Sequence, residues 1–288
     1  MLYHVLLALL PAAIPASPAP AAAAAVAVDR DITYAAGGEN LQLDLARPAG
    51  PGPHPCVVCL HGGAWKFGHR SDVAGFTEQL AREGFAAATV SYRLAPKNKW
   101  PAQIEDVKTA VRFLRANAAR YGLDPDRFAA LGFSAGGHLA ALLGTADKGA
   151  GFEGALYPAE SSRVQCVVDF FGPADLTLYA ETPGIEQAYF RPFLGTLFRD
   201  RPDVYKKASP VNYVSKDDPP FLIVHGTADL IVPVIHSERL RDKLAAAGVP
   251  AELLTVKGGG HGWGGRDAAT TTAATLEFLS KHLLNGKK

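Results

Sequence analysis

The stretch AALGFSAGGHLAALLG, residues 129–144, passes from an apolar run to a serine among glycines and then to small residues. Its first five residues predict a buried strand, and Gly136 to Leu143 predict a helix that can pack closely. Ser134 therefore lies at the junction between this strand and this helix. Residues Gly132 to Gly136 fit G-x-S-x-G, a pattern whose glycines allow a sharp turn that exposes the serine hydroxyl. Because the chain has 29 glycines, a plain strand-turn-helix joint is the alternative unless partners for the serine exist.

The composition describes a folded chain with a large core. Of its 288 residues 48% are hydrophobic and 20% charged, and the formal net charge is +1. Residues 28–288 are long enough for one α/β domain. No dense block of Lys and Arg occurs outside the terminal Lys287-Lys288, which argues against a nucleic-acid partner.

Residues 1–27 are predicted to be a signal peptide. They contain a leucine-rich run from Val5 to Leu10, followed by prolines, alanines and several A-x-A sites, with cleavage expected between Ala16 and Ala27. The start of the leader has no Lys or Arg, so a disordered extension is the alternative. The run is too short to span a membrane. We therefore expect a secreted or periplasmic protein without a membrane span.

Apolar runs of strand length alternate with helical patterns along the chain. Pro101, early acidic residues, late basic residues and Gly122 delimit one helix, whose positions Ile104, Val107 and Val111 form an apolar face. Such alternation predicts a mostly parallel central sheet covered by helices on both faces. The first two strands are expected to extend it antiparallel. The predicted strands are 32–34, 41–45, 56–60, 86–92, 128–133, 164–170, 221–225 and 251–256.

The alternation lapses after the sixth strand, in an aromatic-rich segment at residues 172–210. We interpret it as a small insertion or lid. Its charged residues favour a polar-rimmed cleft over a lipid groove. They include Glu181, Glu186, Arg191, Arg199 and Asp200.

The three cysteines do not form a disulfide framework. Cys56 and Cys59, three apart in one strand, point to opposite faces and lie too far apart to bridge. We interpret both, and Cys166, as buried thiols, with a bond from Cys166 to one of the others as the alternative.

A serine nucleophile needs a base, and the base needs an orienting carboxylate. His261 is the favoured base because it lies in a glycine-rich loop directly after the last strand, whereas His236 and His282 fall in helical segments. Asp229, four residues beyond a strand end, is the favoured acid. Asp175, which also follows a strand, is the competitor, with a turn-capping role as its alternative.

The loop LHGGAW, residues 60–65, follows a strand and offers glycine amides with no side chains to obstruct a substrate. The amides of Gly62, Gly63 and Ala135 are predicted to stabilise negative charge on a carbonyl oxygen. His61 is expected to anchor this loop rather than to react.

Seven segments together resemble the α/β-hydrolase superfamily, specifically the hormone-sensitive-lipase-like carboxylesterases and secreted bacterial relatives similar to acetylxylan and feruloyl esterases. The resemblance covers Leu41 to the C-terminus and implies Ser134 as nucleophile, Asp229 as acid, His261 as base and no cofactor. Phe133 and Ala64 depart from the usual pattern. The segments are LHGGAWKFG, SYRLAP, WPAQIEDV, YGLDPDRFAALGFSAGGHLAALLG, FGPADL, HGTADLIVP and GGGHGWG.

Aromatic residues flank these loops. Trp65 and Trp263, with Phe133 beside the serine, are predicted to line the substrate site; for the tryptophans, Trp100 included, core packing is the alternative. Arg93 and Asp106 are expected to form a structural ion pair. His138 is expected to pack or hydrogen-bond rather than act as a second base. No sequence spacing indicates a metal site.

The sequence predicts an exported serine carboxylesterase for short-chain esters, with acetyl or feruloyl groups on plant polysaccharides as candidate substrates. An amide hydrolase, arylformamidase-like or peptidase-like, is an alternative because one triad serves both bonds. A catalytically silent hydrolase-fold protein that binds a ligand is a third hypothesis.

Overall fold

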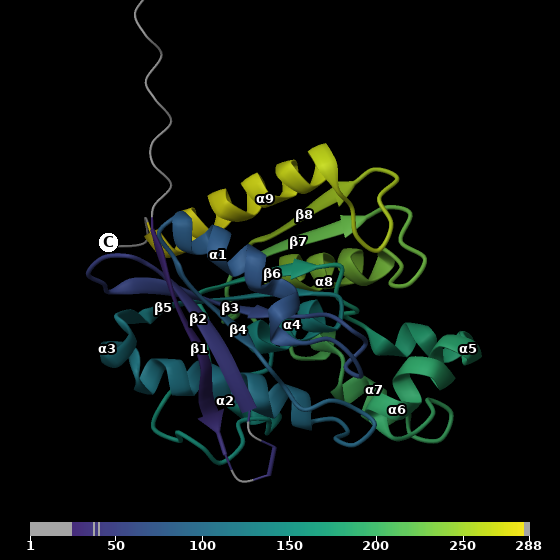
Figure 1. Cartoon of the computed structure of the whole chain (residues 1–288). Coiled ribbons are helices and arrows are strands. Elements are labelled where there is room, and N and C mark those ends of the chain that lie inside the picture. Colours follow the sequence, from purple (N-terminus) through teal and green to yellow (C-terminus); the bar gives the residue numbers. More distant parts are fainter. Residues whose placement is uncertain (1–24, 37, 40, 285–288) are drawn as a thin grey trace, which may run out of the picture.

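The computed structural model describes residues 25–36, 38–39 and 41–284, which form an eight-stranded sheet with helices on both faces (Figure 1). Residues 1–24 of the predicted signal peptide lie outside this part, and the first strand begins at Val26. The strands are β1 (Val26–Ala35), β2 (Leu41–Pro48), β3 (His54–Leu60), β4 (Ala86–Val90), β5 (Leu123–Phe133), β6 (Cys166–Phe170), β7 (Phe221–Gly226) and β8 (Ala251–Val256).

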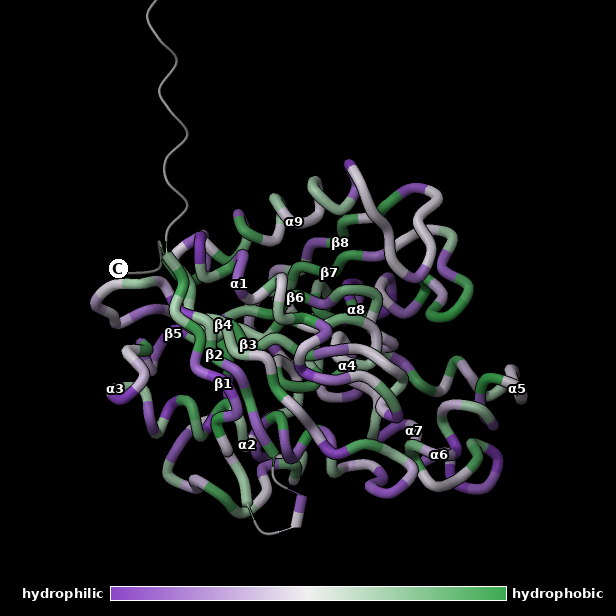
Figure 2. The backbone as a smooth tube through the Cα atoms, in the orientation of Figure 1, coloured by the Kyte–Doolittle hydropathy of each residue, from purple (hydrophilic) through white to green (hydrophobic). Residues whose placement is uncertain are grey.

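The strand order is β1-β2-β4-β3-β5-β6-β7-β8. β1 and β2 pair antiparallel, β2 joins β4 antiparallel, and every pair from β4 to β8 is parallel. The predicted mostly parallel sheet with an antiparallel extension is therefore confirmed. Strands β3, β4, β6 and β7 are largely apolar along their length because both of their faces are covered, and Figure 2 shows the apolar colour along this central part of the sheet.

Helices cover the two faces of the sheet in separate groups. Leu139 of α4 and Val107 of α2 share one buried cluster with Val58, while Leu80 of α1 and Leu279 of α9 share another with strand residues of the opposite face. Figure 1 shows α9 and α1 on one side and α2 on the other. The helices are α1 (Ala74–Arg82), α2 (Ala102–Ala116), α3 (Ala118–Tyr121), α4 (Ala135–Thr145), α5 (Pro183–Ile185), α6 (Arg191–Leu194), α7 (Pro202–Lys207), α8 (Ile235–Ala246) and α9 (Gly265–Leu279).

Some predicted boundaries differ from the structure. The helix expected from Pro101 to Gly122 is divided into α2 and α3, because the backbone of Asn117 leaves the helical region at φ −107° and ψ 18°. Gly122 ends α3 in the left-handed region, as its position predicts. β5 begins at Leu123 rather than Phe128, and β4 ends at Val90 rather than Tyr92.

The insertion follows β6, the sixth strand, as predicted. It contains a 3-10 helix at Leu176–Glu181, α5, a π-helical turn at Glu186–Phe190, α6 and α7. Figure 1 shows α5, α6 and α7 gathered at one side of the molecule.

The three cysteines lie in central strands. Cys56 and Cys59 of β3 and Cys166 of β6 are free and buried. The interpretation as buried thiols is confirmed, and the alternative of a disulfide at Cys166 is wrong.

Gly144 of α4 and Gly75 of α1 should respond oppositely to replacement by alanine. A Cβ at Gly144 would lie 2.6 Å from Phe221 Cζ and 2.7 Å from Val167 Cγ2, whereas a Cβ at Gly75 would meet no atom outside its own helix within 4 Å. Gly144→Ala should lower the free energy of unfolding by about 1–3 kcal/mol. Gly75→Ala should raise it by up to about 1 kcal/mol, because alanine favours helix. Urea denaturation measures both, and equal stabilisation by the two would contradict this packing.

Candidate active site

Ser134 occupies a tight turn between β5 and α4. Its backbone lies at φ 55° and ψ −119°, a conformation rare for residues other than glycine. A Cβ at Gly132 would lie 2.0 Å from the carbonyl oxygen of Gly136, and one at Gly136 would lie 2.2 Å from that of Leu60. Both glycines of the G-x-S-x-G pattern are therefore required by close backbone approach.

Three side chains predicted to act together form a hydrogen-bonded chain. His261 Nε2 lies 2.8 Å from Ser134 Oγ, and His261 Nδ1 lies 2.7 Å from Asp229 Oδ2. Ser134 follows β5, Asp229 follows β7 and His261 follows β8. The three meet because the carboxyl ends of parallel strands collect at one edge of the sheet.

Asp229 is held as an anion in a buried setting. Its Oδ1 accepts hydrogen bonds from the amides of Ile231 at 2.8 Å and Val232 at 3.0 Å. Burial by itself would raise the pKa of this carboxyl. Interactions with His225, His261 and the two amides outweigh burial and hold the pKa well below its ordinary value. Asp229 is thus ionised and can orient His261.

His225 is a neighbour of Asp229 that sequence reasoning missed. It lies in β7, fully buried, with Nε2 2.8 Å from the carbonyl oxygen of Val232 and 3.4 Å from Asp229 Oδ2. Its Nδ1 lies 2.6 Å from Ser237 Oγ. The signal in the sequence is its position. His225 lies four residues before Asp229, near the end of β7, the strand that Asp229 follows.

Asp175, the competing acid, is engaged elsewhere. Its Oδ2 accepts from Arg239 NH1 at 2.7 Å, and its Oδ1 accepts from the amide of Thr177 at 3.1 Å, at the start of the 3-10 helix Leu176–Glu181. This is the capping role that was its alternative.

The Gly62-Gly63 turn lies against the serine. A Cβ at Gly62 would lie 3.3 Å from Ser134 Cβ, and Gly63 has a φ of 109°, where side chains are disfavoured. Gly62, Gly63 and Ala135 line the same cavity as Ser134. Ala135 is the first residue of α4, whose first-turn amides have no partner within the helix. The amides predicted to stabilise an oxyanion thus lie beside the nucleophile candidate.

His61 anchors this turn, as predicted. Its ring stacks on Tyr92 with centroids 4.4 Å apart, and its Nδ1 lies 2.7 Å from the carbonyl oxygen of Gly62. The Tyr92 hydroxyl donates to the carbonyl oxygen of His61 at 2.9 Å. The amide of Ala95 donates to the carbonyl oxygen of Trp65, also at 2.9 Å. The loop that carries Tyr92 and Ala95 therefore supports the turn.

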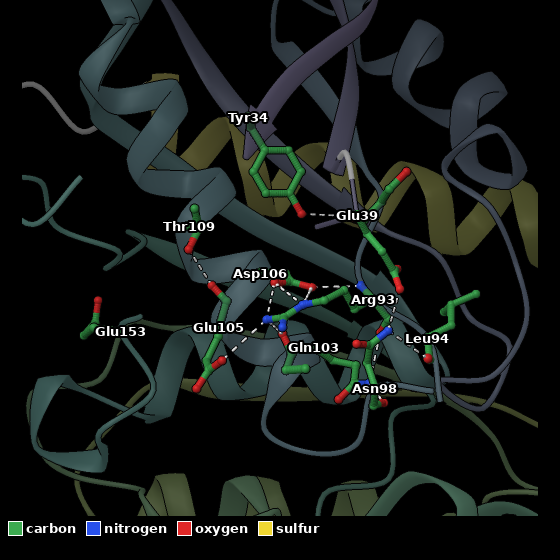
Figure 3. A network of polar contacts seen from close by, with 12 residues as sticks. Tyr34, Glu39, Arg93, Leu94, Asn98, Gln103, Glu105, Asp106, Thr109 and Glu153 are labelled. Carbon is green, nitrogen blue, oxygen red and sulfur yellow. Dashed lines mark hydrogen bonds and ion pairs between the residues drawn. The ribbon is translucent and has the colours of Figure 1, made fainter. Parts of the chain in front are cut away.

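A polar network in turn braces that supporting loop (Figure 3). Asp106 accepts from the amide of Arg93 at 2.8 Å and pairs with its guanidinium at 2.7 Å. Gln103 donates to the carbonyl oxygens of Arg93 at 2.9 Å and Asn98 at 2.8 Å. The expected structural ion pair is therefore present, and it acts through backbone rather than on a substrate.

The site opens into a cavity of about 440 Å³. The buried lining residues, such as Trp65 and Phe190, form its floor, while Phe67, 62% exposed, and Ile231, 54% exposed, lie at its mouth. Several lining residues lie outside the loops that the sequence analysis singled out, and they were not predicted. Some of them belong to the insertion, whose aromatic-rich composition was the signal in the sequence. The lining is Gly62, Gly63, Ala64, Trp65, Phe67, Phe133, Ser134, Ala135, Phe171, Pro173, Tyr179, Ile185, Tyr189, Phe190, Ile231, Val232 and His261.

Two expectations about the cavity need correction. Trp263 does not line it: the ring packs 5.4 Å from that of Phe171 and Nε1 donates to Thr271 Oγ1 at 3.0 Å, so the packing alternative applies. The expected polar rim is also absent from the described lining, where His261 is the one titratable side chain apart from tyrosines. Glu186 instead turns toward Tyr205, whose hydroxyl donates to it at 2.9 Å.

Trp65 links the Gly62-Gly63 turn to the insertion. Its ring stacks on Phe193 with centroids 4.1 Å apart, and its Nε1 donates to His138 Nδ1 at 3.2 Å. His138 Nε2 lies 2.7 Å from the carbonyl oxygen of Ala208, so the neutral ring donates there. Burial lowers the pKa of His138 to about 4. His138 thus has the predicted hydrogen-bonding role.

Within residues 25–36, 38–39 and 41–284, no helix combines the length and apolarity needed to cross a bilayer. The same residues contain no group of three or more His, Cys, Asp or Glu side chains suited to hold a metal ion.

The sequence model of one protein family, described as BD-FAE, matches residues 43–244. The chain belongs to the BD-FAE family. Esterase LipC of Mycobacterium tuberculosis is 34% identical to it over 227 residues, which cover 76% of this chain and 55% of LipC. This BD-FAE chain therefore spans about half the length of that curated relative.

Solved structures share the fold of this BD-FAE chain. A truncated carbohydrate esterase from gut microbiota superposes with a TM-score of 0.77 at 30% identity, covering 91% of this chain and 98% of the other. An acetyl ester-xyloside bifunctional hydrolase from Caldicellulosiruptor lactoaceticus gives 0.74 at 27% identity, covering 85% and 89%. The α/β-hydrolase fold expected from the sequence is confirmed.

Asp229→Asn and Asp175→Asn should separate the two candidate acids. Asparagine at 229 cannot stabilise a protonated His261, so ester hydrolysis should fall on the order of 10⁴-fold. Asp175→Asn removes the negative charge that pairs with Arg239 outside the Ser134 cavity, and it should change kcat less than about threefold. Steady-state kinetics on p-nitrophenyl acetate measure both, and the reverse order would assign the acid to Asp175.

Proposed function

We propose that this chain is a serine carboxylesterase in which Ser134, His261 and Asp229 form the catalytic triad. The observation that carries the proposal is the continuous hydrogen-bonded chain from Ser134 Oγ through both ring nitrogens of His261 to Asp229 Oδ2. The esterases among its relatives support the same reaction class.

The geometry supports a two-step reaction. Ser134 Oγ attacks the ester carbonyl carbon while His261 Nε2 accepts the hydroxyl proton, and Asp229 stabilises the imidazolium that forms. The amides of Gly62, Gly63 and Ala135 stabilise the oxyanion. His261 then donates the proton to the departing alcohol, which leaves an acyl group on Ser134. Water, activated by His261, hydrolyses this acyl-enzyme and restores the serine.

Ser134→Ala tests the nucleophile. The variant should fold normally, lose labelling by a fluorophosphonate probe, and show a kcat lowered on the order of 10⁴- to 10⁶-fold, because covalent catalysis is removed. The control is Ser71→Ala, a change at an exposed serine outside the cavity, which should be labelled like the parent protein. Labelling of the Ser134→Ala variant would assign the nucleophile elsewhere.

The other functional hypotheses make different predictions for the same assays. An amide hydrolase on this triad would cleave aryl formamides or peptide amides with a higher kcat/KM than the matched esters. A catalytically silent binding protein would remain unlabelled by the fluorophosphonate, because that probe reacts with activated serines.

We propose short acyl groups as substrates, acetyl first, with acetyl or feruloyl esters on plant polysaccharides as the natural class. A cavity of about 440 Å³ with a floor of aromatic rings such as Trp65 and Phe190 supports a small acyl group. The exposed rings of Phe67 and Tyr189 at its mouth can stack on sugar or phenolic rings. The names of the carbohydrate esterase and the acetyl ester-xyloside hydrolase support this class. Export through the predicted signal peptide would bring the enzyme to such polymers.

Chain length and polymer use can be measured together. We expect kcat/KM to fall from p-nitrophenyl acetate through butyrate to octanoate, and acetate to be released from acetylated xylan. A longer chain gains about 0.8 kcal/mol per methylene only where a methylene can be buried, and the volume of the cavity, about 440 Å³, limits how many methylenes fit. An octanoate optimum without acetate release from xylan would contradict this substrate class.

A further inference from the structure

A second concave surface lies beside the mouth of the catalytic cavity. We call it the cationic groove. Three segments distant in sequence form it: the turn after Gly63, the loop before α2, and the insertion. Its volume is about 430 Å³, and its lining residues are Lys66, Pro96, Lys99, Gln187, Arg191, Pro192 and Gly195.

The charges of this groove have one sign. Among the described residues, none of Lys66, Lys99 and Arg191 forms an ion pair with a carboxylate, whereas the nearby Lys97 is paired with Glu39 at 2.6 Å. Lys66 Nζ donates one hydrogen bond, to the carbonyl oxygen of Ala188 at 3.0 Å, and an ammonium group has three donors. The whole chain has a net charge of only +1, so general basicity does not explain three cations in one groove.

Another polar cavity of the protein shows the contrast. That cavity is lined by Glu39, Arg93, Glu105 and Asp106 among other residues, so its charges have both signs. Arg93 pairs with Glu105 and Asp106, as Figure 3 shows, and Glu39 pairs with Lys97. Each of these charged groups therefore has a partner of opposite charge, whereas those of the cationic groove lack a described anionic partner.

The groove adjoins the catalytic cavity through Lys66. Its Nζ lies 5.3 Å from the ring centroid of Phe67 and 6.0 Å from that of Tyr189, and both rings line the catalytic cavity. An anionic group is costly to bury in that apolar cavity. If the acyl group fills the floor, the alcohol part extends to the mouth, next to these cations.

We propose that the cationic groove binds an anionic oxygen group, a carboxylate or a phosphate, on the alcohol part of the ester. The substrate class is then an acylated acidic sugar, either a uronic acid or a sugar phosphate. This inference rests on the proposed esterase function and adds a specificity site to it. Lys99 and Arg191 attract the anion from the outer side of the groove, and Lys66 does so from the side of the cavity.

Three monoacetylated sugars test the proposal: methyl glucuronoside, glucose 6-phosphate and the neutral methyl glucoside. The parent enzyme should have a higher kcat/KM for an anionic ester than for the neutral one, and the preference should shrink as salt rises, because exposed charges are screened. The preferred anion distinguishes carboxylate from phosphate. Lys99→Ala and Arg191→Ala should each reduce the preference about two- to fivefold, the scale of exposed ion pairs.

Charge reversal with a matched control makes the test specific. Lys99→Glu should reduce the anionic preference more than Lys99→Ala does, whereas Lys97→Glu, on the same loop but outside the groove lining, should leave the preference intact. Equal kcat/KM for charged and neutral esters in the parent enzyme, or equal effects of the two reversals, would overturn the proposal. Binding of the parent enzyme to phosphatidylglycerol vesicles that depends on Lys99, without an anionic-ester preference, would overturn it in favour of a lipid surface.

A binding measurement separates this proposal from the esterase assignment. Isothermal titration calorimetry of the Ser134→Ala variant with methyl glucuronoside and inorganic phosphate should detect Lys99-dependent binding of one of them, and no binding of either would overturn the proposal. Failure of the parent enzyme to hydrolyse p-nitrophenyl acetate would instead contradict the esterase function. Hydrolysis of that ester without any anionic preference would refute the groove proposal alone.

Discussion

The close approach of backbone at the turn between β5 and α4 is the constraint on which the rest of the site depends. Gly132, Gly136 and Leu60 bring main-chain atoms so near that a single Cβ would overlap a carbonyl oxygen. This contact forces Ser134 into a rare backbone conformation and exposes its hydroxyl at the end of the strand. The sheet around this turn is buried on both faces, so the packed core stabilises a backbone conformation that an isolated segment would not adopt.

Support for the Gly62-Gly63 turn comes from two directions. On one side, Tyr92 and Ala95 donate hydrogen bonds to the carbonyl oxygens of His61 and Trp65, which flank the turn, and Asp106 fixes their loop through Arg93. On the other side, Trp65 stacks on Phe193 of the insertion. The turn is therefore clamped between the core of the sheet and the insertion. Such a preorganised set of amides needs little rearrangement when charge develops on a carbonyl oxygen.

Charge is distributed unevenly around the site. Asp229 is a buried carboxylate stabilised by several donors, the catalytic cavity is largely apolar, and the cationic groove lies just outside it. The two surfaces suit different parts of one substrate. The apolar cavity suits a small acyl group, and the cations of the groove suit an anionic group that remains near water. Separating the two avoids the cost of burying a charge in the apolar cavity.

The sequence by itself determined the succession of strands and helices along the chain, because apolar periodicity and turn residues are local signals. It also indicated Ser134, Asp229 and His261 as candidates, since each follows a strand whose end lies at the same edge of a parallel sheet. Only the tertiary structure decided what depends on distant segments: that Asp175 pairs with Arg239, that Trp263 packs away from the cavity, and that the insertion turns Glu186 inward. These outcomes are set by side chains that meet across the fold, which no local pattern encodes.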